Sequence, residues 1–213
     1  ILHYGSEILN CPAGLLFFDG TLLKDLRPDG ASLTLTELAH HAFYDREHSR
    51  PLTAECTHHC TDNTFSFGCA FVEIEVDLPL GKVRVVEVVN VHDSGVLINP
   101  ALAEAQVHGG QAMGIGYGLS EQLRYDATGR LCNGNLLDYK LPTALDLPDL
   151  QARFVQEPDP SGPFGNKSLG EPPLIPVAPA IRNALLHATG VAVDSLPLDP
   201  QKLVALFQKK GLL

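Results

Sequence analysis

The chain has 213 residues, of which 45% are hydrophobic and 19% are charged, and its formal net charge at pH 7 is -10. This composition excludes a disordered chain and predicts one domain, or two closely joined lobes, around a hydrophobic core. The acidic balance and the lack of Lys and Arg clusters argue against nucleic acid or an anionic membrane surface as a partner. The sequence has neither the apolar run of a membrane span nor the pattern of a signal peptide, so we expect a cytoplasmic protein.

The five cysteines are an odd set without the spacing of a disulfide scaffold, which favours a reducing compartment. They also lack the Cys-x4-Cys-x2-Cys run of an iron-sulfur site. The run Cys56-Thr57-His58-His59-Cys60 has the residue types that zinc prefers. A structural zinc site normally brings two separated ligand pairs, and no second pair follows, so we name no metal-ligating residue.

The first 50 residues predict a small hairpin-helix segment. Two β-rich runs, at 15–18 and 21–23, flank an Asp-Gly turn, which is a hairpin signal. A helix is predicted over 37–44, capped by Thr34 or Thr36. Because the chain begins with Ile1 rather than Met, we expect residues 1–50 to be the remnant of a preceding lobe and residues 51–213 to form a C-terminal lobe.

The C-terminal lobe has the pattern of an α+β fold. Residues 65–76 and 82–91 are rich in β-branched and aromatic residues, and they predict an antiparallel pair with one core face and one polar face. Further elements follow from cap, turn and breaker residues: a long helix over 100–122, a short hairpin around 126–129, a strand at 151–156, a helix over 176–189 and a last helix from 200 to 211. We expect mixed or antiparallel sheets packed with two or three long helices.

A loop at 164–173 places one carboxylate at a defined point. Gly165 and Gly170 allow tight turns, and Pro172-Pro173 prevents a helix or a central strand directly afterwards, so Glu171 lies on a stiff loop before the 176–189 helix. The alternative is a surface glutamate near a helix start, where negative charge is mildly favourable. The residues alone do not decide between these interpretations.

The predicted helix at 100–122 carries glycines beside a single amide. Gln106, Gly109, Gly110, Met113 and Tyr117 follow one another at spacings of one, three and four, which places them on one broad face. Glycine inside a helix costs roughly 1 kcal/mol relative to alanine, so something must approach this face closely. From the residues alone, the tight packing of another element is favoured over a binding site.

The run Lys167-Ser168-Leu169-Gly170-Glu171-Pro172-Pro173 resembles the loop that carries the catalytic base in the xanthine dehydrogenase and aldehyde oxidase family of molybdenum hydroxylases. The runs at 90–95, 99–100, 106–110 and 135–143 match as well. The resemblance is nearly continuous from about residue 66 onward, and it is strongest to the C-terminal part of the molybdenum-binding subunit of bacterial xanthine dehydrogenases.

The resemblance implies a molybdopterin-binding domain and assigns roles to single residues. Glu171 would be the base that deprotonates Mo–OH as its oxygen attacks an electron-poor carbon. Gln106 would hydrogen-bond the pterin, and Gly109, Gly170 and Lys167 would complete the cofactor-binding set. Lys167 could also stabilise the ionised Glu171 or be an ordinary solvated lysine, and these readings stay open.

The resemblance also implies a reaction and partners. It predicts an oxidoreductase of purine metabolism that hydroxylates xanthine or hypoxanthine, with the remainder of the molybdenum subunit, 2Fe-2S clusters and FAD on partner subunits or domains. Aldehydes, nicotinate-type N-heterocycles and hydroxybenzoyl-CoA are alternative substrates within the family. We expect the chain alone to be inactive, and an alternative of another class is a non-catalytic fragment that associates with itself into a homo-oligomer.

Overall fold

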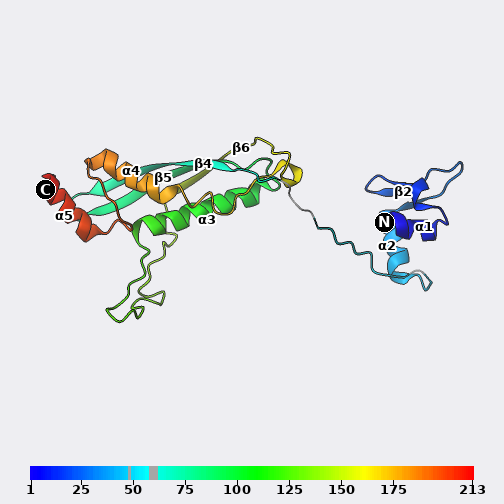
Figure 1. Cartoon of the computed structure of the whole chain (residues 1–213), viewed down its shortest axis with the longest axis horizontal. Coiled ribbons are helices and arrows are strands. Elements are labelled where there is room, and N and C mark those ends of the chain that lie inside the picture. The colour runs from blue at the N-terminus through cyan, green and yellow to red at the C-terminus, as the bar shows by residue number, and fades with distance from the viewer. Residues whose placement is uncertain (48, 58–61) are drawn as a thin grey trace. The chain divides into compact units, whose positions relative to one another are not determined.

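The computed structural model describes residues 1–47, 49–57 and 62–213, in two compact units, Ile1–His59 and Cys60–Leu213. Figure 1 shows the helices and strands of each unit. In the described ranges, no helix is long and apolar enough to cross a lipid bilayer.

The N-terminal unit is a three-stranded antiparallel sheet with two helices. Its elements are α1 (Leu2–Ile8), a 3-10 turn (Ala13–Leu15), β1 (Leu16–Phe18), β2 (Leu22–Asp25), β3 (Ser32–Thr34) and α2 (Leu35–Tyr44), with the strand order β1-β2-β3. The predicted hairpin is confirmed, and an Asp19 carboxylate oxygen accepts hydrogen bonds from the backbone N–H groups of Thr21 and Leu22. Thr34 is the cap of α2 and forms a capping box with Glu37.

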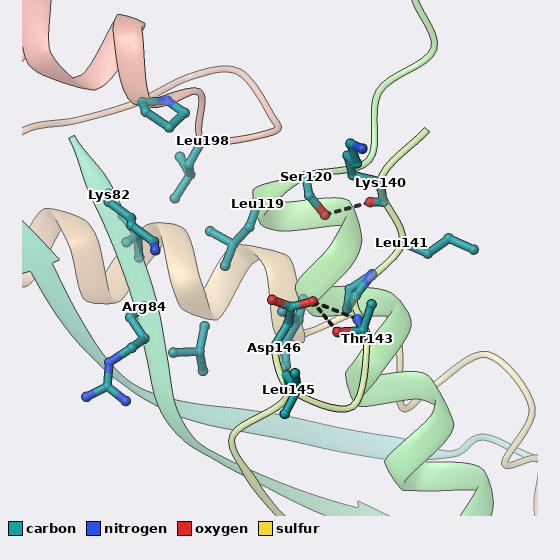
Figure 2. A pocket seen from close by; sticks show the side chains of 15 residues that line it. Lys82, Arg84, Leu119, Ser120, Lys140, Leu141, Thr143, Leu145, Asp146 and Leu198 are labelled. Carbon is teal, nitrogen blue, oxygen red and sulfur yellow. Dashed lines mark hydrogen bonds between the residues drawn. The ribbon is translucent and has the colours of Figure 1, made fainter. Parts of the chain in front are cut away.

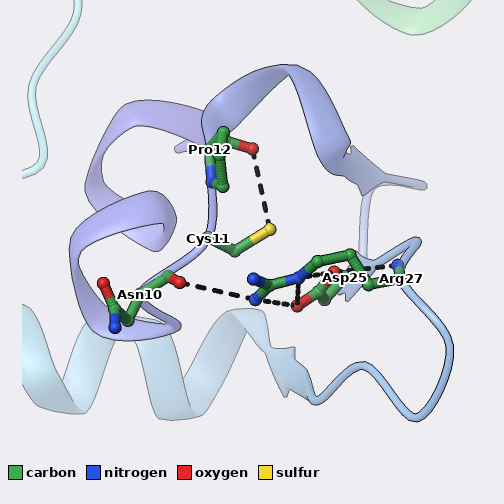
Figure 3. A network of polar contacts seen from close by, with 5 residues as sticks. All are labelled: Asn10, Cys11, Pro12, Asp25 and Arg27. Atoms are coloured by element: carbon green, nitrogen blue, oxygen red, sulfur yellow. Dashed lines mark hydrogen bonds and ion pairs between the residues drawn. The ribbon is translucent and has the colours of Figure 1, made fainter.

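A buried cluster and one polar network stabilise the N-terminal unit. The cluster comprises Tyr4, Cys11, Leu16, Leu23, Leu38 and Ala42. Beside it, the Arg27 guanidinium donates to the Asp25 carboxylate at 2.6 Å and to the Asn10 backbone oxygen at 3.4 Å (Figure 3). The hydrogen bonds from Arg27 lower the pKa of Asp25 to about 2. The bond to Asn10 connects the end of β2 to the residues that follow α1.

The C-terminal unit is a mixed three-stranded sheet. It comprises β4 (Phe67–Asp77), β5 (Lys82–Asp93) and β6 (Asp149–Val155), in the order β4-β5-β6. β4 and β5 are antiparallel, as predicted. The side chains on one face of β4, which include its acidic residues, are exposed, and those on the other face pack on the core. β6 runs parallel to β5, because the chain crosses over through a helix between them.

Three helices pack with this sheet. They are α3 (Pro100–Leu119), α4 (Val177–Thr189) and α5 (Pro200–Lys210). α3 runs alongside the sheet and packs on α4, and both helices contact the strands (Figure 1). Their shared core includes Val85, Val88, Ile115, Ile181, Leu185 and Phe207. A second 3-10 turn, Pro163–Gly165, opens the 164–173 loop.

An irregular segment connects α3 to β6. Residues 120–148 leave the body of the unit at the end of α3 and return to it at β6 (Figure 1). The predicted short hairpin here is reduced to one β-bridge between Tyr125 and Leu131. Leu136, Leu137 and Leu145 on this segment have 78%, 79% and 97% of their surface exposed, so the segment buries little of its own apolar surface.

Candidate active site

The start of the 164–173 loop is joined to the turn that follows β5. The backbone N–H of Lys167 donates to the Ser94 carbonyl oxygen at 2.8 Å, and the N–H of Val96 donates to the Gly165 carbonyl oxygen at 3.0 Å. Gly95 has a φ of +64°, and a Cβ at this position would lie 2.1 Å from the Gly165 oxygen. Only glycine therefore allows the two segments to approach this closely.

A buried ion pair adds a charged link between the same segments. The Lys167 ammonium lies 2.6 Å from an Asp93 carboxylate oxygen, and the two side chains are only 7% and 16% exposed. The other Asp93 oxygen accepts from the N–H of Gly95 at 3.1 Å. The hydrogen bond from Lys167 is the largest of the effects that lower the pKa of Asp93. Lys167 is therefore a buried partner of Asp93, an aspartate that the sequence analysis did not select.

Three further side chains bind backbone carbonyls of the loop. Ser66 Oγ donates to the Ser168 oxygen at 2.6 Å, and Gln106 Nε2 donates to the Gly170 oxygen at 2.9 Å. Asn90 Nδ2 donates to the Pro173 oxygen at 2.9 Å, and this bond is buried. The loop is thus fixed at both ends and in the middle by residues from β5, α3 and the segment before β4.

Glu171 lies on this fixed backbone with a free side chain. Its carbonyl oxygen accepts from the Leu174 N–H at 3.0 Å, whereas its exposed carboxylate makes no hydrogen bond within the described ranges. α4 begins at Val177, six residues later. A helix dipole acts mainly within the first turn, so this distance weakens the reading of Glu171 as a helix-start charge.

Gln106 and two predicted glycines border open space. Gln106 is exposed and contacts Gly170, and a Cβ at Gly109 or at Gly170 would meet no atom within 4 Å. Gly110 differs, because a Cβ there would lie 2.5 Å from the Pro173 Cβ. The glycines of α3 therefore divide into one that faces open space and others, such as Gly110, that allow close packing.

Polar side chains are also buried beneath the loop. Asn90 and His92 lie on the core-facing side of β5, and Ser94 is buried in the turn that follows. Gln111 on α3 donates to the Val88 carbonyl oxygen. Each has at least one buried polar atom without a partner in the described part of the chain, including both ring nitrogens of His92. The sequence pattern could have predicted the buried polar side chains of β5. Alternate residues of a strand share one face, and these polar residues lie an even number of positions after Val88, which is buried in the core.

A separate cavity of about 560 Å³ lies at the other end of β5 (Figure 2). Lys82, Arg84, Lys140 and Asp146 line it, and Ser120 Oγ donates to the Lys140 carbonyl oxygen beside it. Its lining includes none of the residues predicted for catalysis or cofactor binding. We therefore place the candidate active site at the loop and not in this cavity.

The run Cys56-Thr57-His58-His59-Cys60, considered for zinc, falls largely outside the described residues, which omit 58–61. In the ranges that are described, no three His, Cys, Asp or Glu side chains gather as a metal-binding group.

The comparisons with known proteins place this fold in the class of molybdopterin-binding domains. The chain belongs to the molybdopterin cofactor-binding domain family, whose model matches residues 1–148. It is 46% identical, over its whole length, to the putative xanthine dehydrogenase molybdenum-binding subunit XdhA of Escherichia coli K12, and it spans 28% of that protein. It is 39% identical over 143 residues to the nicotine 6-hydroxylase large subunit of Paenarthrobacter nicotinovorans, covering 66% of the chain and 18% of that protein.

Solved structures agree with this assignment. Quinoline 2-oxidoreductase from Pseudomonas putida 86 superimposes with a TM-score of 0.76 at 26% identity, over 98% of this chain and 28% of that chain. A Cu,Mo-CO dehydrogenase gives a TM-score of 0.77 at 25% identity, over 99% of this chain and 27% of that chain. The predicted family and the α+β fold class are confirmed, and the chain spans between 18% and 28% of the length of these proteins.

Proposed function

We propose that the chain contributes the base loop and part of the cofactor surface to a molybdenum-dependent oxidoreductase of the xanthine dehydrogenase type. One observation carries this proposal. The loop at 164–173 is held by hydrogen bonds from Gln106 and Asn90 to its backbone oxygens and by the ion pair of Lys167 with Asp93, while the carboxylate of Glu171 makes no hydrogen bond to a described residue. A general base must be held in a defined place and still be able to accept a proton, and this arrangement meets both conditions.

The open patch beside Glu171 fits a pterin edge. Because Gln106 Nε2 donates one hydrogen to Gly170, the amide keeps its oxygen and its second N–H for a ligand that both donates and accepts. Gly109 and Gly170 leave the space around the amide open for a flat group. The molybdenum cofactor, when bound, would supply the two-electron oxidation of the substrate carbon.

Glu171 would accept the proton of the hydroxyl that attacks the substrate. The fixed loop limits how far its carboxylate can move, so little ordering entropy is lost when the reacting groups meet. Lys167 would take no direct part, because its ammonium is bound to Asp93.

We propose a purine as the substrate. The support is the 46% identity to a xanthine dehydrogenase subunit across the whole chain, against a shorter match to an enzyme named for nicotine. An aldehyde or another N-heterocycle is the alternative, since relatives of both kinds match this chain.

The partners would be the remainder of the molybdenum-binding subunit and subunits or domains that carry 2Fe-2S clusters and FAD. The exposed leucines at 136, 137 and 145 support a covering protein surface, because single soluble domains seldom expose so many large apolar side chains together. The chain's five cysteines lack the spacing of an iron-sulfur site, so electrons would leave through another subunit.

The test is xanthine turnover by the complete molybdenum-binding subunit, assembled with its partner subunits, with Glu171→Gln compared with wild type. We expect kcat per bound molybdenum to fall by about 10² to 10⁴, the range for loss of a general base, with molybdenum retained. Glu73→Gln is a matched control, because Glu73 is an exposed carboxylate on β4, and its turnover should equal that of wild type. Near-normal turnover by Glu171→Gln would contradict the base assignment.

A further inference from the structure

We propose that Asp93 is a positioning residue for Glu171, acting through its buried ion pair with Lys167. This inference rests on the proposed role of Glu171 as the base. It concerns how the loop keeps that carboxylate in place, and it replaces the sequence-based expectation that Lys167 contacts the cofactor or Glu171 directly.

The cost of burying this pair indicates a specific purpose. Lysine is rarely buried unless it is paired, and desolvation of two charges offsets much of their attraction, so such pairs add little net stability. At 7% and 16% exposure, Lys167 and Asp93 are largely removed from water. We therefore assign this pair to fixing the geometry of the loop rather than to stability.

Asp93 connects three segments that meet at the loop. Besides Lys167, its carboxylate accepts from the backbone N–H groups of Gly95 at 3.1 Å and Glu157 at 3.4 Å. Gly95 lies in the turn after β5, and Glu157 lies on the segment that leads into the loop. Asp93, at the end of β5, therefore holds both Glu157, on the segment before the loop, and Lys167 within the loop.

The ion pair differs in kind from the other anchors of the loop. Ser66, Gln106 and Asn90 each donate one neutral hydrogen bond to a backbone oxygen. Among the side-chain anchors within the described ranges, the contact between Lys167 and Asp93 is the ionic one. Lys167 lies four residues before Glu171. Without Asp93, the Lys167 ammonium would have to leave its buried position for water, and the loop would shift with it.

The test uses Asp93→Asn, Lys167→Met and the double variant in the assembled enzyme. A misplacement of about 1 Å can cost about 10²-fold in rate, so we expect each single variant to lower kcat per molybdenum by about 10- to 100-fold. KM and molybdenum content should stay near their wild-type values. The double variant should lose no more than the worse single variant, because the two residues act as one unit.

A second ion pair on the same sheet supplies the control. Arg84 and Glu75 also approach to 2.6 Å, but their side chains are 62% and 64% exposed. Glu75→Gln should therefore leave kcat, KM and the metal content unchanged. Amide hydrogen exchange of a peptide covering 165–173 should accelerate in Asp93→Asn and Lys167→Met, and not in the control.

The outcomes separate this inference from the proposed function. If Glu171→Gln abolishes turnover while Asp93→Asn and Lys167→Met keep wild-type kcat, the base assignment stands and the positioning role is wrong. If the single variants lose molybdenum in proportion to activity, the pair serves folding or cofactor retention, and the inference is also overturned. If Glu171→Gln keeps its activity, the proposed function itself fails.

Discussion

His92 is fully buried on β5, and both of its ring nitrogens lack a partner within the described residues. Burial lowers the pKa of this imidazole, so it stays neutral in the folded chain below the pH at which an exposed histidine takes up a proton. At pH values between the pKa of His92 in the folded chain and the ordinary value of about 6.5, the unfolded chain binds a proton that the folded chain does not. The free energy of unfolding therefore falls as the pH falls through this range.

The expected result is a smaller loss of stability on acidification in His92→Gln than in wild type. Urea unfolding of the chain near pH 7.5 and near pH 5 measures it, and the difference between the two proteins cancels the contributions of the other histidines. Equal acid sensitivity would show that His92 is protonated in the fold or has a partner that offsets its burial.

At the level of single residues, Glu171 and Gln106 were selected because they lie in runs that resemble a known family, and their roles stay predictions. Asp93 was not selected as a site residue, because its partner Lys167 lies 74 positions later and only the folded chain brings the two together. The charge of Lys167 was noted, but its burial and direction depend on tertiary contacts that no local pattern records.

Two adjacent glycines on α3 allow a sharp test at the level of elements. A Cβ at Gly110 would lie 2.5 Å from the Pro173 Cβ, at the end of the 164–173 loop, whereas a Cβ at Gly109 would meet nothing within 4 Å. Gly110→Ala should therefore lower both the unfolding midpoint and turnover. Gly109→Ala should raise the midpoint, because alanine is favoured over glycine in a helix interior. It should lower molybdenum content, because the added methyl group would occupy the proposed cofactor surface.

Thermal unfolding and metal analysis of the two variants measure this difference. If Gly109→Ala binds molybdenum normally, Gly109 does not border the cofactor. If Gly110→Ala is as stable as wild type, the close packing of α3 on the loop is not needed.

The elements that the sequence predicted best are those with explicit start and stop residues. α4 ends at Gly190 and α5 at Gly211, both with positive φ, and α3 is capped by Asn99. α1 and β3 were missed, because seven and three residues are too few to establish a period. The parallel direction of β6 could not be predicted either, since it depends on the path of α3 across the sheet.

Each unit has its own hydrophobic core. The cluster around Val88, Ile181 and Phe207 contains residues of the C-terminal unit alone, and the cluster around Leu23 and Leu38 contains residues of the N-terminal unit alone. The sequence analysis set its boundary between residues 50 and 51, after the predicted hairpin-helix segment. Contacts divide the chain near residue 60, and the family model spans both units.

A chain that starts at residue 62 should therefore fold without the N-terminal unit. Its sheet, its three helices and its core are complete within 62–213, so we expect one cooperative urea transition with the midpoint that the same elements show in the whole chain. Circular dichroism and intrinsic tyrosine fluorescence would follow the transition. A broad, non-cooperative transition would show that the C-terminal core depends on residues 1–61, and the two units would then form a single domain.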